Sequence, residues 1–556
     1  MSSLDCRDPS DITVGVADIE AAARDLVEGL QRRPWGQTST SVYETGRLVT
    51  LSPWLTGHAE RVTYLLTGQR PDGGWGAPNN GYALVPTLSA AEALLSELSR
   101  PAPRDPQTTA TAVDRALCFL TERLFPALTT LDALPDMPAI ELIAPALIER
   151  INEHLAALPS APAPPAALAR WAGVRLTPPA GMDGARLPLV RELLNSGAEP
   201  PQKLLHALEI AGDAAVGLPQ IRHEPTGTIG ASPAATAAWL GDSHPAEPSN
   251  PARWYLETVT SLHDGPVPCG FPLTVFERGW VLAWLTRAGV PLSVPPALVL
   301  SLTAPLGPNG TSAAAGLPAD ADTTAGALYA LALLDVPHPP DSLWAYETES
   351  HFCTWQGEDG YSTTTNAHVL EAFGQFLVKV PAHRIEGTLA KRYSETVAKI
   401  TNWLRDRQRT DGCWTDRWHA SPYYATACCS IALARFGDDA AAAPVEAARR
   451  WILANQRADG SWGRWQGTAE ETAYAVQTLL LTESEPSHAS LRAVARAEAK
   501  LLGHLASPVS GSTGPDIEDE PALWHDKDLY HPGAIVRAAV LSALLLIRKS
   551  ANARER

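Results

Sequence analysis

Two aspartates one residue apart, Asp320 and Asp322, stand directly before an apolar stretch with the composition of a helix, AGALYALALL. Two adjacent carboxyl groups in a dry pocket favour sharing a proton, because ionising both would bring like charges together. One of them can then give that proton to a substrate. Aspartate at a helix start is also an ordinary N-cap, since its side chain accepts hydrogen bonds from free backbone N–H groups. The pair predicts a helix cap or a proton donor, and the two roles are compatible.

A second motif, a glutamine followed by Gly and Trp, recurs along the chain. It reads YLLTGQRPDGGWG at 64–76, WLRDRQRTDGCW at 403–414 and WILANQRADGSWG at 451–463. A degenerate copy that lacks the Trp lies at 226–230. Each copy sits between two amphipathic stretches, which predicts a helix, a Gly-containing turn and a second helix. We expect the Trp to pack on a neighbouring helix and the Gln amide to bond free backbone groups there. Such helix pairs bury their apolar faces by stacking on one another.

Composition points to an all-α globular protein. The chain has 556 residues, of which 45% are hydrophobic and 19% charged, and its 48 prolines cluster between helical patterns. A net charge of −17 without any basic run predicts no nucleic-acid partner. No stretch has the length of a membrane span, and the N-terminus is too polar for a signal peptide. Seven cysteines without a CxxC pair fit reduced thiols in the cytoplasm.

The repeats together with the Asp-x-Asp-Thr-Thr segment resemble the class II terpene cyclases, especially bacterial members that act on linear isoprenoid diphosphates. The resemblance runs along nearly the whole chain, although Glu44 and Gly46 depart from the family pattern. Other segments that carry it are SVYETGRLV (41–49), IELIAPALIE (140–149), KLLHALE (203–209), SPAATAAWL (232–240), FPLTVFERGWVLAWL (271–285), STTTNAHVLEA (362–372), TDRWHASPYYATA (415–427), TAEETAYAVQ (468–477) and KDLYHPGAIVRAAVLSAL (527–544).

The resemblance implies two α-barrel domains, called β and γ in this family, with the active cavity between them. The γ domain is inserted after the first helix of the β domain. In this chain we expect residues 1–44 to hold that first helix, residues 45–285 to form γ, and residues 286–556 to form the rest of β.

By the same resemblance, Asp322 is the acid that protonates a carbon–carbon double bond, and Asp320 is its hydrogen-bonded partner. An alkene is a very poor base, so the acid must be desolvated and aimed at one carbon. Thr323 stands where the family has another Asp, and its hydroxyl can still bond the donor. Asn366 matches a residue that orients the acid in relatives, or it caps the helix that follows it.

Carbocations that follow protonation need aromatic faces and exclusion of water. The family resemblance assigns four aromatic side chains to the cavity wall, with plain core packing as the alternative: Trp418, Tyr423, Tyr424 and Tyr530. His206 matches one half of a His–Asn pair that positions a water in plant relatives, whereas the other half falls on Cys269. His206 is therefore a candidate base, and an ordinary satisfied helix histidine is its alternative.

The diphosphate must be held without being expelled, and the acidic clusters that would expel it with several magnesium ions are absent from the sequence. A single Mg²⁺ suits simple anchoring. Glu141 matches the family's Phe-Glu position, so the resemblance implies it as the candidate ligand. Candidate phosphate contacts are Lys203, Arg417 and Lys527, each of which has a solvated surface charge as its alternative.

The acid motif with its paired threonines resembles that of bacterial enzymes making drimenyl diphosphate, so the resemblance implies conversion of farnesyl diphosphate to drimenyl diphosphate, which we expect of a monomer or homodimer. The alternative is conversion of geranylgeranyl diphosphate to a copalyl- or halimadienyl-type diphosphate. Two further hypotheses remain: a squalene-hopene-type triterpene cyclase, which would carry more Gln–Trp repeats, and a non-catalytic α-barrel module, which would tolerate loss of Asp322.

Overall fold

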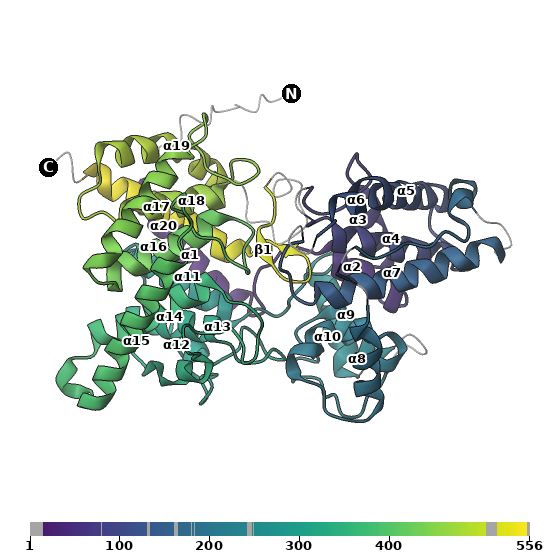
Figure 1. Cartoon of the computed structure of the whole chain (residues 1–556), viewed down its shortest axis with the longest axis horizontal. Helices are drawn as coiled ribbons and strands as arrows, with labels where there is room; N and C mark the ends of the chain where they lie inside the picture. The colour runs from purple at the N-terminus through teal and green to yellow at the C-terminus, as the bar shows by residue number, and fades with distance from the viewer. Residues whose placement is uncertain are drawn as a thin grey trace, which may run out of the picture.

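Helices make up two lobes that lie side by side (Figure 1). The structure, a computed structural model, describes residues 15–78, 81–130, 134–160, 165–179, 181–182, 184–241, 247, 249–506 and 520–552. Within these ranges the only sheet is one antiparallel pair of two-residue strands, β1 (Trp524–His525) and β2 (Leu529–Tyr530). The prediction of an all-α fold is confirmed. None of the described helices combines the length and apolar character needed to cross a bilayer.

The lobe that we call the β lobe is a closed ring of helices inside an outer layer. The inner ring runs through α11, α13, α14, α16, α18 and α20, each of which packs on the next, and α20 closes onto α11. The helices of this lobe are α1 (Val16–Arg32), α11 (Val275–Arg287), α12 (Pro296–Thr303), α13 (Ala321–Leu333), α14 (Thr363–Lys379), α15 (Gly387–Asp406), α16 (Pro422–Phe436), α17 (Ala442–Ala454), α18 (Ala469–Leu481), α19 (His488–Ala506) and α20 (Gly533–Asn552), with short helices η7 (Pro340–Tyr346), η8 (Ala382–Arg384) and η9 (Asp439–Ala441).

The γ lobe is built in the same way. Its inner elements α2, α4, α7, η6 and α9 pack in sequence around the lobe, and α9 returns to α2. Its helices are α2 (Val42–Leu51), α3 (His58–Thr67), α4 (Leu84–Leu98), α5 (Pro106–Cys118), η2 (Phe119–Leu124), α6 (Phe125–Ala127), α7 (Ile140–Ala157), η4 (Leu158–Ser160), η5 (Ala166–Trp171), α8 (Arg186–Asn195), η6 (Gln202–Ala215), α9 (Pro233–Leu240) and α10 (Pro251–Leu262).

The predicted joins between the lobes need correction at both ends. The join at 44/45 falls inside α2, whose partners α4 and α9 are γ-lobe helices. The join at 285/286 falls inside α11, whose partners are α13, α20 and α1 of the β lobe. Both joins were wrong because an apolar helix read from sequence does not reveal which barrel it packs in. The insertion of γ after α1 agrees with the prediction.

The Gln–Trp repeats hold helix ends together, as predicted. In the first copy, the amide of Gln69 donates to the carbonyls of Gly73 and Ala112, each at 2.9 Å, and the indole N–H of Trp75 donates to the carbonyl of Leu65 at 2.7 Å. The same contacts recur in the other two copies, made by Gln408 with Trp414 and by Gln456 with Trp462. Leu65 lies in the last turn of α3, where carbonyl groups lack partners within their own helix, so the indole satisfies one of them. Ala112 lies inside α5, so the Gln amide ties the turn to that neighbouring helix.

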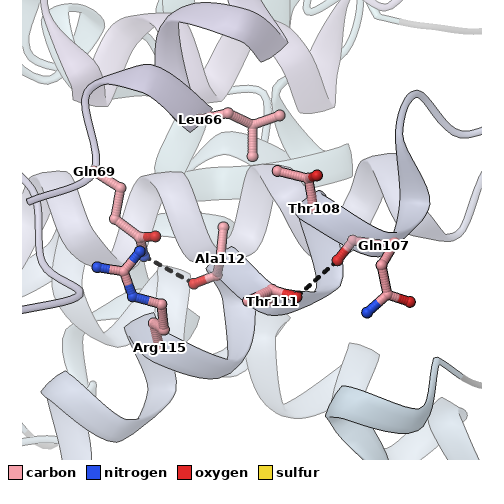
Figure 2. A pocket seen from close by; sticks show the side chains of 7 residues that line it. All are labelled: Leu66, Gln69, Gln107, Thr108, Thr111, Ala112 and Arg115. Atoms are coloured by element: carbon pink, nitrogen blue, oxygen red, sulfur yellow. Dashed lines mark hydrogen bonds between the residues drawn. The ribbon is translucent and has the colours of Figure 1, made fainter. Parts of the chain in front are cut away.

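Figure 2 shows that first repeat from close by, at a shallow pocket of about 210 Å³ between α3 and α5. Gln69 points across it to Ala112. The guanidinium of Arg115, the charged group in this pocket, donates to the carbonyls of Arg70 and Pro71. The repeat therefore serves the fold, as the sequence predicted.

The β1–β2 hairpin lies between the two lobes (Figure 1) and belongs to the cores of both. Leu523 and Leu529 pack in the main γ-lobe core, whereas Trp524 and Tyr530 pack in the β-lobe core. Side chains that are neighbours along a strand point to opposite faces, so a short hairpin can join two cores. This hairpin brings the residues of the two lobes together at the candidate site.

Candidate active site

Asp320 is the N-cap of α13. Its Oδ1 accepts the backbone N–H of Thr323 at 2.6 Å, which confirms the capping alternative for this residue. Burial raises the pKa of Asp320 to about 8, so this carboxyl group is protonated at neutral pH. Thr323 contacts Asp320, and not Asp322, through this backbone N–H. The carboxyl group of Asp320 therefore caps the helix and is also an uncharged neighbour of Asp322.

Asp322, in the first turn of α13, forms an ion pair with His368. Its Oδ1 lies 2.8 Å from Nδ1 of His368 on α14. Burial opposes a charge on His368, but the Asp322 carboxylate overrides this and holds the pKa of His368 well above its usual value. The imidazolium of His368 therefore lies against the carboxyl group of Asp322. It stabilises the Asp322 carboxylate that remains after that group has given up a proton.

Asn366 does not orient Asp322, contrary to prediction. Its amide exchanges hydrogen bonds with the backbone N–H and carbonyl of Phe352, and it donates to the carbonyl of Ser362. The helix cap is Ser362, so the capping alternative for Asn366 is also wrong. His368, two residues further along the same helix, takes the orienting position. Residues two apart on a helix point in different directions, so a shift of two residues replaces the contacting side chain.

A wall of buried aromatic rings stands beside the acid. The ring of His368 lies 4.9 Å from that of Trp280, whose indole N–H donates to the Tyr424 hydroxyl at 2.9 Å. Trp524, on the hairpin, lies 4.7 Å from Tyr424 and 5.6 Å from Phe276. These five rings are buried, yet the Asp322 side chain is 15% exposed. Asp322 therefore keeps some accessible surface beside ring faces that can stabilise a cation.

Glu470, which the sequence reading missed, fixes this wall. Its Oε1 accepts hydrogen bonds from the indole of Trp524 at 2.7 Å and the hydroxyl of Tyr474 at 2.9 Å, and it pairs with His419 at 3.1 Å. Burial opposes its charge, but the bonds from His419 keep the pKa of Glu470 below its usual value. The signal in the sequence was a pair of glutamates, TAEET at 468–472, directly before the apolar run AYAVQTLLL.

The predicted aromatic residues divide into two groups. Tyr424 and Tyr530 lie with the wall, and the Tyr530 ring is 6.4 Å from that of Trp524. Trp418 lies close to the start of α13, because its indole N–H donates to Thr354, whose carbonyl in turn accepts the N–H of Ala321. Tyr423 instead packs at 4.8 Å on Trp451 of the outer layer, so its assignment to the wall is wrong. Adjacent helix residues point about 100° apart, so both tyrosines could not face inward.

Lys527 is not available to a phosphate group, contrary to prediction. Its ammonium group is fully buried and pairs with Glu44 and Glu209 of the γ lobe, while it donates to Ser232 and to the carbonyl of His206. A lysine surrounded by two carboxylates and two further acceptors has no hydrogen to offer a ligand. Lys527 therefore ties the hairpin to the γ lobe.

His206 pairs with Asp526, at the tip of the same hairpin. Its Nε2 lies 2.8 Å from Asp526 Oδ1 and its Nδ1 lies 2.6 Å from the carbonyl of Gly230. Cys269 is buried beside this pair, 3.8 Å from the carbonyl of Asp528. His206 therefore reaches the site from the γ lobe, but as one partner of an ion pair.

The remaining diphosphate candidates lie nearer the outside. Lys203 is exposed at the start of η6. Arg417 bridges the lobes: it donates to the carbonyl of Asp359 at 2.7 Å and pairs with Asp136 of the γ lobe at 2.9 Å. Glu141 is 42% exposed and pairs with Arg186 at 3.5 Å.

No cluster of three or more His, Cys, Asp and Glu side chains within the described ranges could hold a metal ion. Mg²⁺ is commonly held by one or two carboxylates together with substrate phosphates. Glu141 fits only that shared arrangement, in which the substrate supplies most of the oxygens.

A cavity of about 700 Å³ opens where the lobes meet. Tyr82, Arg123 and Leu134 of the γ lobe line it together with Arg464 of the β lobe. The Tyr82 hydroxyl lies 3.0 Å from His525, the residue after Trp524, so this cavity adjoins the hairpin. Pro135, another lining residue, precedes the Asp136 that pairs with Arg417. Cationic side chains and an apolar surface therefore meet at the lobe junction.

Comparisons with known proteins agree with this geometry. Residues 366–502 match the family described as Squalene-hopene cyclase C-terminal domain. An ent-copalyl diphosphate synthase of Streptomyces sp. (strain KO-3988) is 40% identical over 541 residues, which cover 97% of this chain and 98% of that protein. A labda-7,13-dienyl diphosphate synthase of Streptomyces clavuligerus is 39% identical over 529 residues, which cover 94% and 92%. The solved structure of an ent-copalyl diphosphate synthase from Streptomyces platensis matches with a TM-score of 0.86 at 44% identity, covering 95% and 99%.

Two helical barrels and an acid beside a wall of buried aromatic rings define a class II terpene cyclase, an enzyme that starts cyclisation by protonation. Within that class, the chain belongs to the diterpene cyclases related to bacterial copalyl diphosphate synthases. This corrects the preference for a farnesyl substrate and a drimenyl product, because the relatives favour the geranylgeranyl alternative. The preference was wrong because the Asp-x-Asp-Thr-Thr segment identifies the acid but carries no information about the length of the substrate pocket.

Proposed function

We propose that this protein converts geranylgeranyl diphosphate to a bicyclic, copalyl-type diphosphate and keeps the diphosphate group. The observation that carries the proposal is the Asp322–His368 pair, which lies beside a wall of buried aromatic rings in a chain whose full-length relatives are named as diphosphate synthases. Those names describe products that retain the diphosphate. The choice of geranylgeranyl diphosphate over farnesyl diphosphate as substrate rests on the same names.

Asp322 is the proton donor in this proposal. It acts in its protonated form, with the proton on Oδ2, and the carboxylate–imidazolium pair with His368 is the state after transfer. The paired oxygen, Oδ1, is fixed by His368, and none of the described residues donates a hydrogen bond to Oδ2. The proton leaves towards the terminal double bond of the substrate, and the imidazolium stabilises the carboxylate left behind. Asp320, protonated at neutral pH, adds no negative charge that would hold the proton back.

The aromatic wall then directs the cation that forms. Trp280, Tyr424 and Trp524 offer ring faces to tertiary cations, and their burial keeps water from capturing these intermediates. Trp280 is hydrogen-bonded to Tyr424 and Trp524 to Glu470, and the rings of Tyr424 and Trp524 pack on each other, so their positions are set before substrate arrives. A wall fixed in this way favours one folding of the prenyl chain.

Arg417 is the proposed contact for the diphosphate. Its partner Asp136 is 62% exposed, so their ion pair is weak and a diphosphate can replace the carboxylate. Bound Mg²⁺ would neutralise phosphate charge, with Glu141 as the protein ligand. We expect Arg417→Ala to raise KM for the substrate about tenfold or more with little change in kcat, since it removes binding that is uniform through the reaction. We further propose that the enzyme works in the cytoplasm, where its described cysteines stay unpaired.

The test is incubation with geranylgeranyl or farnesyl diphosphate and Mg²⁺, followed by dephosphorylation and mass spectrometry of the alcohols. We expect a bicyclic diterpene alcohol from geranylgeranyl diphosphate and none from the Asp322→Asn variant. A bicyclic alcohol from farnesyl diphosphate alone would restore the sesquiterpene assignment. Squalene cyclisation without turnover of either diphosphate would move the protein to the triterpene branch.

A further inference from the structure

The lobe junction holds a second carboxylate–imidazole pair, Asp526 with His206, in addition to Asp322 with His368. The carbonyl of Gly230 can only accept a hydrogen bond, so Nδ1 of His206 carries a hydrogen. Burial opposes charge on both partners, but their attraction raises the pKa of His206 and lowers that of Asp526. Nε2 therefore carries a hydrogen as well, and His206 has no lone pair left to take a proton from a substrate.

Asp526 keeps one carboxylate oxygen uncommitted. Its Oδ1 accepts from His206 and from the backbone N–H of Lys527 at 2.7 Å, whereas none of the described residues donates to Oδ2. The Asp526 side chain is 15% exposed, although Lys527, Asp528 and Cys269 around it are buried. A Cβ on Gly270 would lie 3.1 Å from Oδ2, so glycine leaves that oxygen uncovered. Oδ2 is therefore the oxygen of Asp526 that a bound molecule can reach.

Asp526 and Asp322 both act electrostatically on the buried side chain of Tyr530. Tyr530 pairs with Trp524 across the hairpin, and Asp526 stands two residues beyond Trp524, about 7 Å along an extended chain. The pKa of Tyr530 is raised well above its usual value, first by burial and then by Asp526, Cys269 and Asp322. The acid of the β lobe and the carboxylate of the hairpin turn therefore lie near the same buried aromatic side chain.

The other nearby groups cannot serve as the base. Burial raises the pKa of the Cys269 thiol well above its usual value, so the sulfur keeps its proton. Asp528 accepts hydrogen bonds on both oxygens, from Ser41 and the Tyr43 N–H on Oδ2 and from the Leu529 N–H on Oδ1. Of these three groups around the hairpin turn, Asp526 is therefore the one with an ionised, accessible oxygen.

We propose that Asp526 is the catalytic base that ends the reaction, with His206 as the residue that holds its carboxylate in place. The proposal rests on the proposed cyclisation of an isoprenoid diphosphate. A C–H bond next to a carbocation is extremely acidic, so position matters more than base strength. A carboxylate whose basicity is reduced by an imidazolium meets that need.

The step balances as an isomerisation. Asp322 adds one proton to the terminal double bond, and ring closure moves the positive charge to a ring carbon. Asp526 Oδ2 removes one proton from a neighbouring carbon, and the electrons of that C–H bond form the new double bond. Asp526 then passes its proton to water and Asp322 regains one from water.

The test compares products of Asp526→Asn with those of the wild type and of Asp528→Asn, a matched change two residues away in the same hairpin turn. We expect Asp526→Asn to consume geranylgeranyl diphosphate, because Asp322 is intact. In this variant, the fraction of cyclised product with the double bond at the wild-type position should fall at least about tenfold. Double-bond isomers, or bicyclic alcohols formed by capture of water, should replace it. Asp528→Asn should keep the wild-type product pattern whatever its rate.

Asp526→Glu, which keeps a carboxylate, should return most of the flux to alkenes, and thermal unfolding establishes that each variant is folded. An unchanged product pattern in Asp526→Asn would overturn the proposal, and so would complete loss of substrate consumption in a folded Asp526→Asn protein. If Asp526→Asn does not fold, the proposal fails unless Asp526→Glu shifts the position of the double bond relative to wild type. A wild type that consumes neither diphosphate would instead refute the proposed function.

Discussion

Nδ1 of His368 lies 2.8 Å from Oδ1 of Asp322, and this contact joins the first turn of α13 to α14 inside the β barrel. It makes an imidazolium, rather than a second carboxylate, the direct partner of the acid. The acid is thus oriented by a neighbouring helix and not by the other aspartate of its own motif.

His368→Ala should reduce kcat about 10²-fold, because the acid loses the group that fixes its direction. His368→Asn can restore a hydrogen bond without a positive charge, so it should recover part of that loss. Steady-state kinetics of the two variants, with thermal unfolding as the control for folding, checks this. Equal kcat in His368→Ala and wild type would show that the pair does not act on the acid.

Asp320→Asn should keep the helix cap, because asparagine caps as well as aspartate does. The pKa of Asp320 is raised to about 8 in the folded protein, so the folded state binds its proton more tightly than the unfolded state. This contribution to stability is complete below the unfolded pKa near 4 and is lost as pH rises through about 8.

The asparagine variant should therefore lose less stability than wild type between pH 5 and about pH 8. Denaturant unfolding at several pH values measures the difference. Parallel stability–pH curves for the two proteins would contradict the assignment of a protonated Asp320.

Glu470→Gln should destabilise the protein by about 2 kcal/mol, because it removes a charge-assisted hydrogen bond to His419 and weakens the anchor of Trp524. A looser wall should also admit water, which raises the share of hydroxylated products. Product analysis beside denaturant unfolding separates the two effects. A destabilised variant with the wild-type product pattern would limit Glu470 to a structural role.

Lys527→Met should cost about 3–5 kcal/mol, because it leaves Glu44 and Glu209 buried without their cation. The surface change Lys203→Met provides the control and should leave the free energy of unfolding nearly unchanged. If Lys527 contacted the diphosphate instead, its replacement would raise KM and leave the unfolding free energy intact.

The repeats and the helix starts could be predicted from sequence because their physics is local. A Gln, a Gly and a Trp at fixed spacing place an amide and an indole against the same carbonyls in all three copies. Asp320 likewise caps the helix that its own segment begins.

Contacts between distant segments were harder to predict. His368 and Asn366 are both plausible partners for Asp322 until the orientation of α14 is known. Lys527 resembles a ligand-binding lysine until Glu44 and Glu209 from the other lobe surround it. The ends of the γ lobe were misplaced for the same reason, since packing partners decide them.

The most direct measurement of the central claim is turnover of geranylgeranyl diphosphate in deuterated water, with Asp322→Asn beside the wild type. Protonation by Asp322 predicts a bicyclic product with one deuterium at the carbon of the former terminal double bond. It also predicts a rate in Asp322→Asn at least about 10²-fold lower. A cyclic product without deuterium, or a variant that turns over at the wild-type rate, would contradict it.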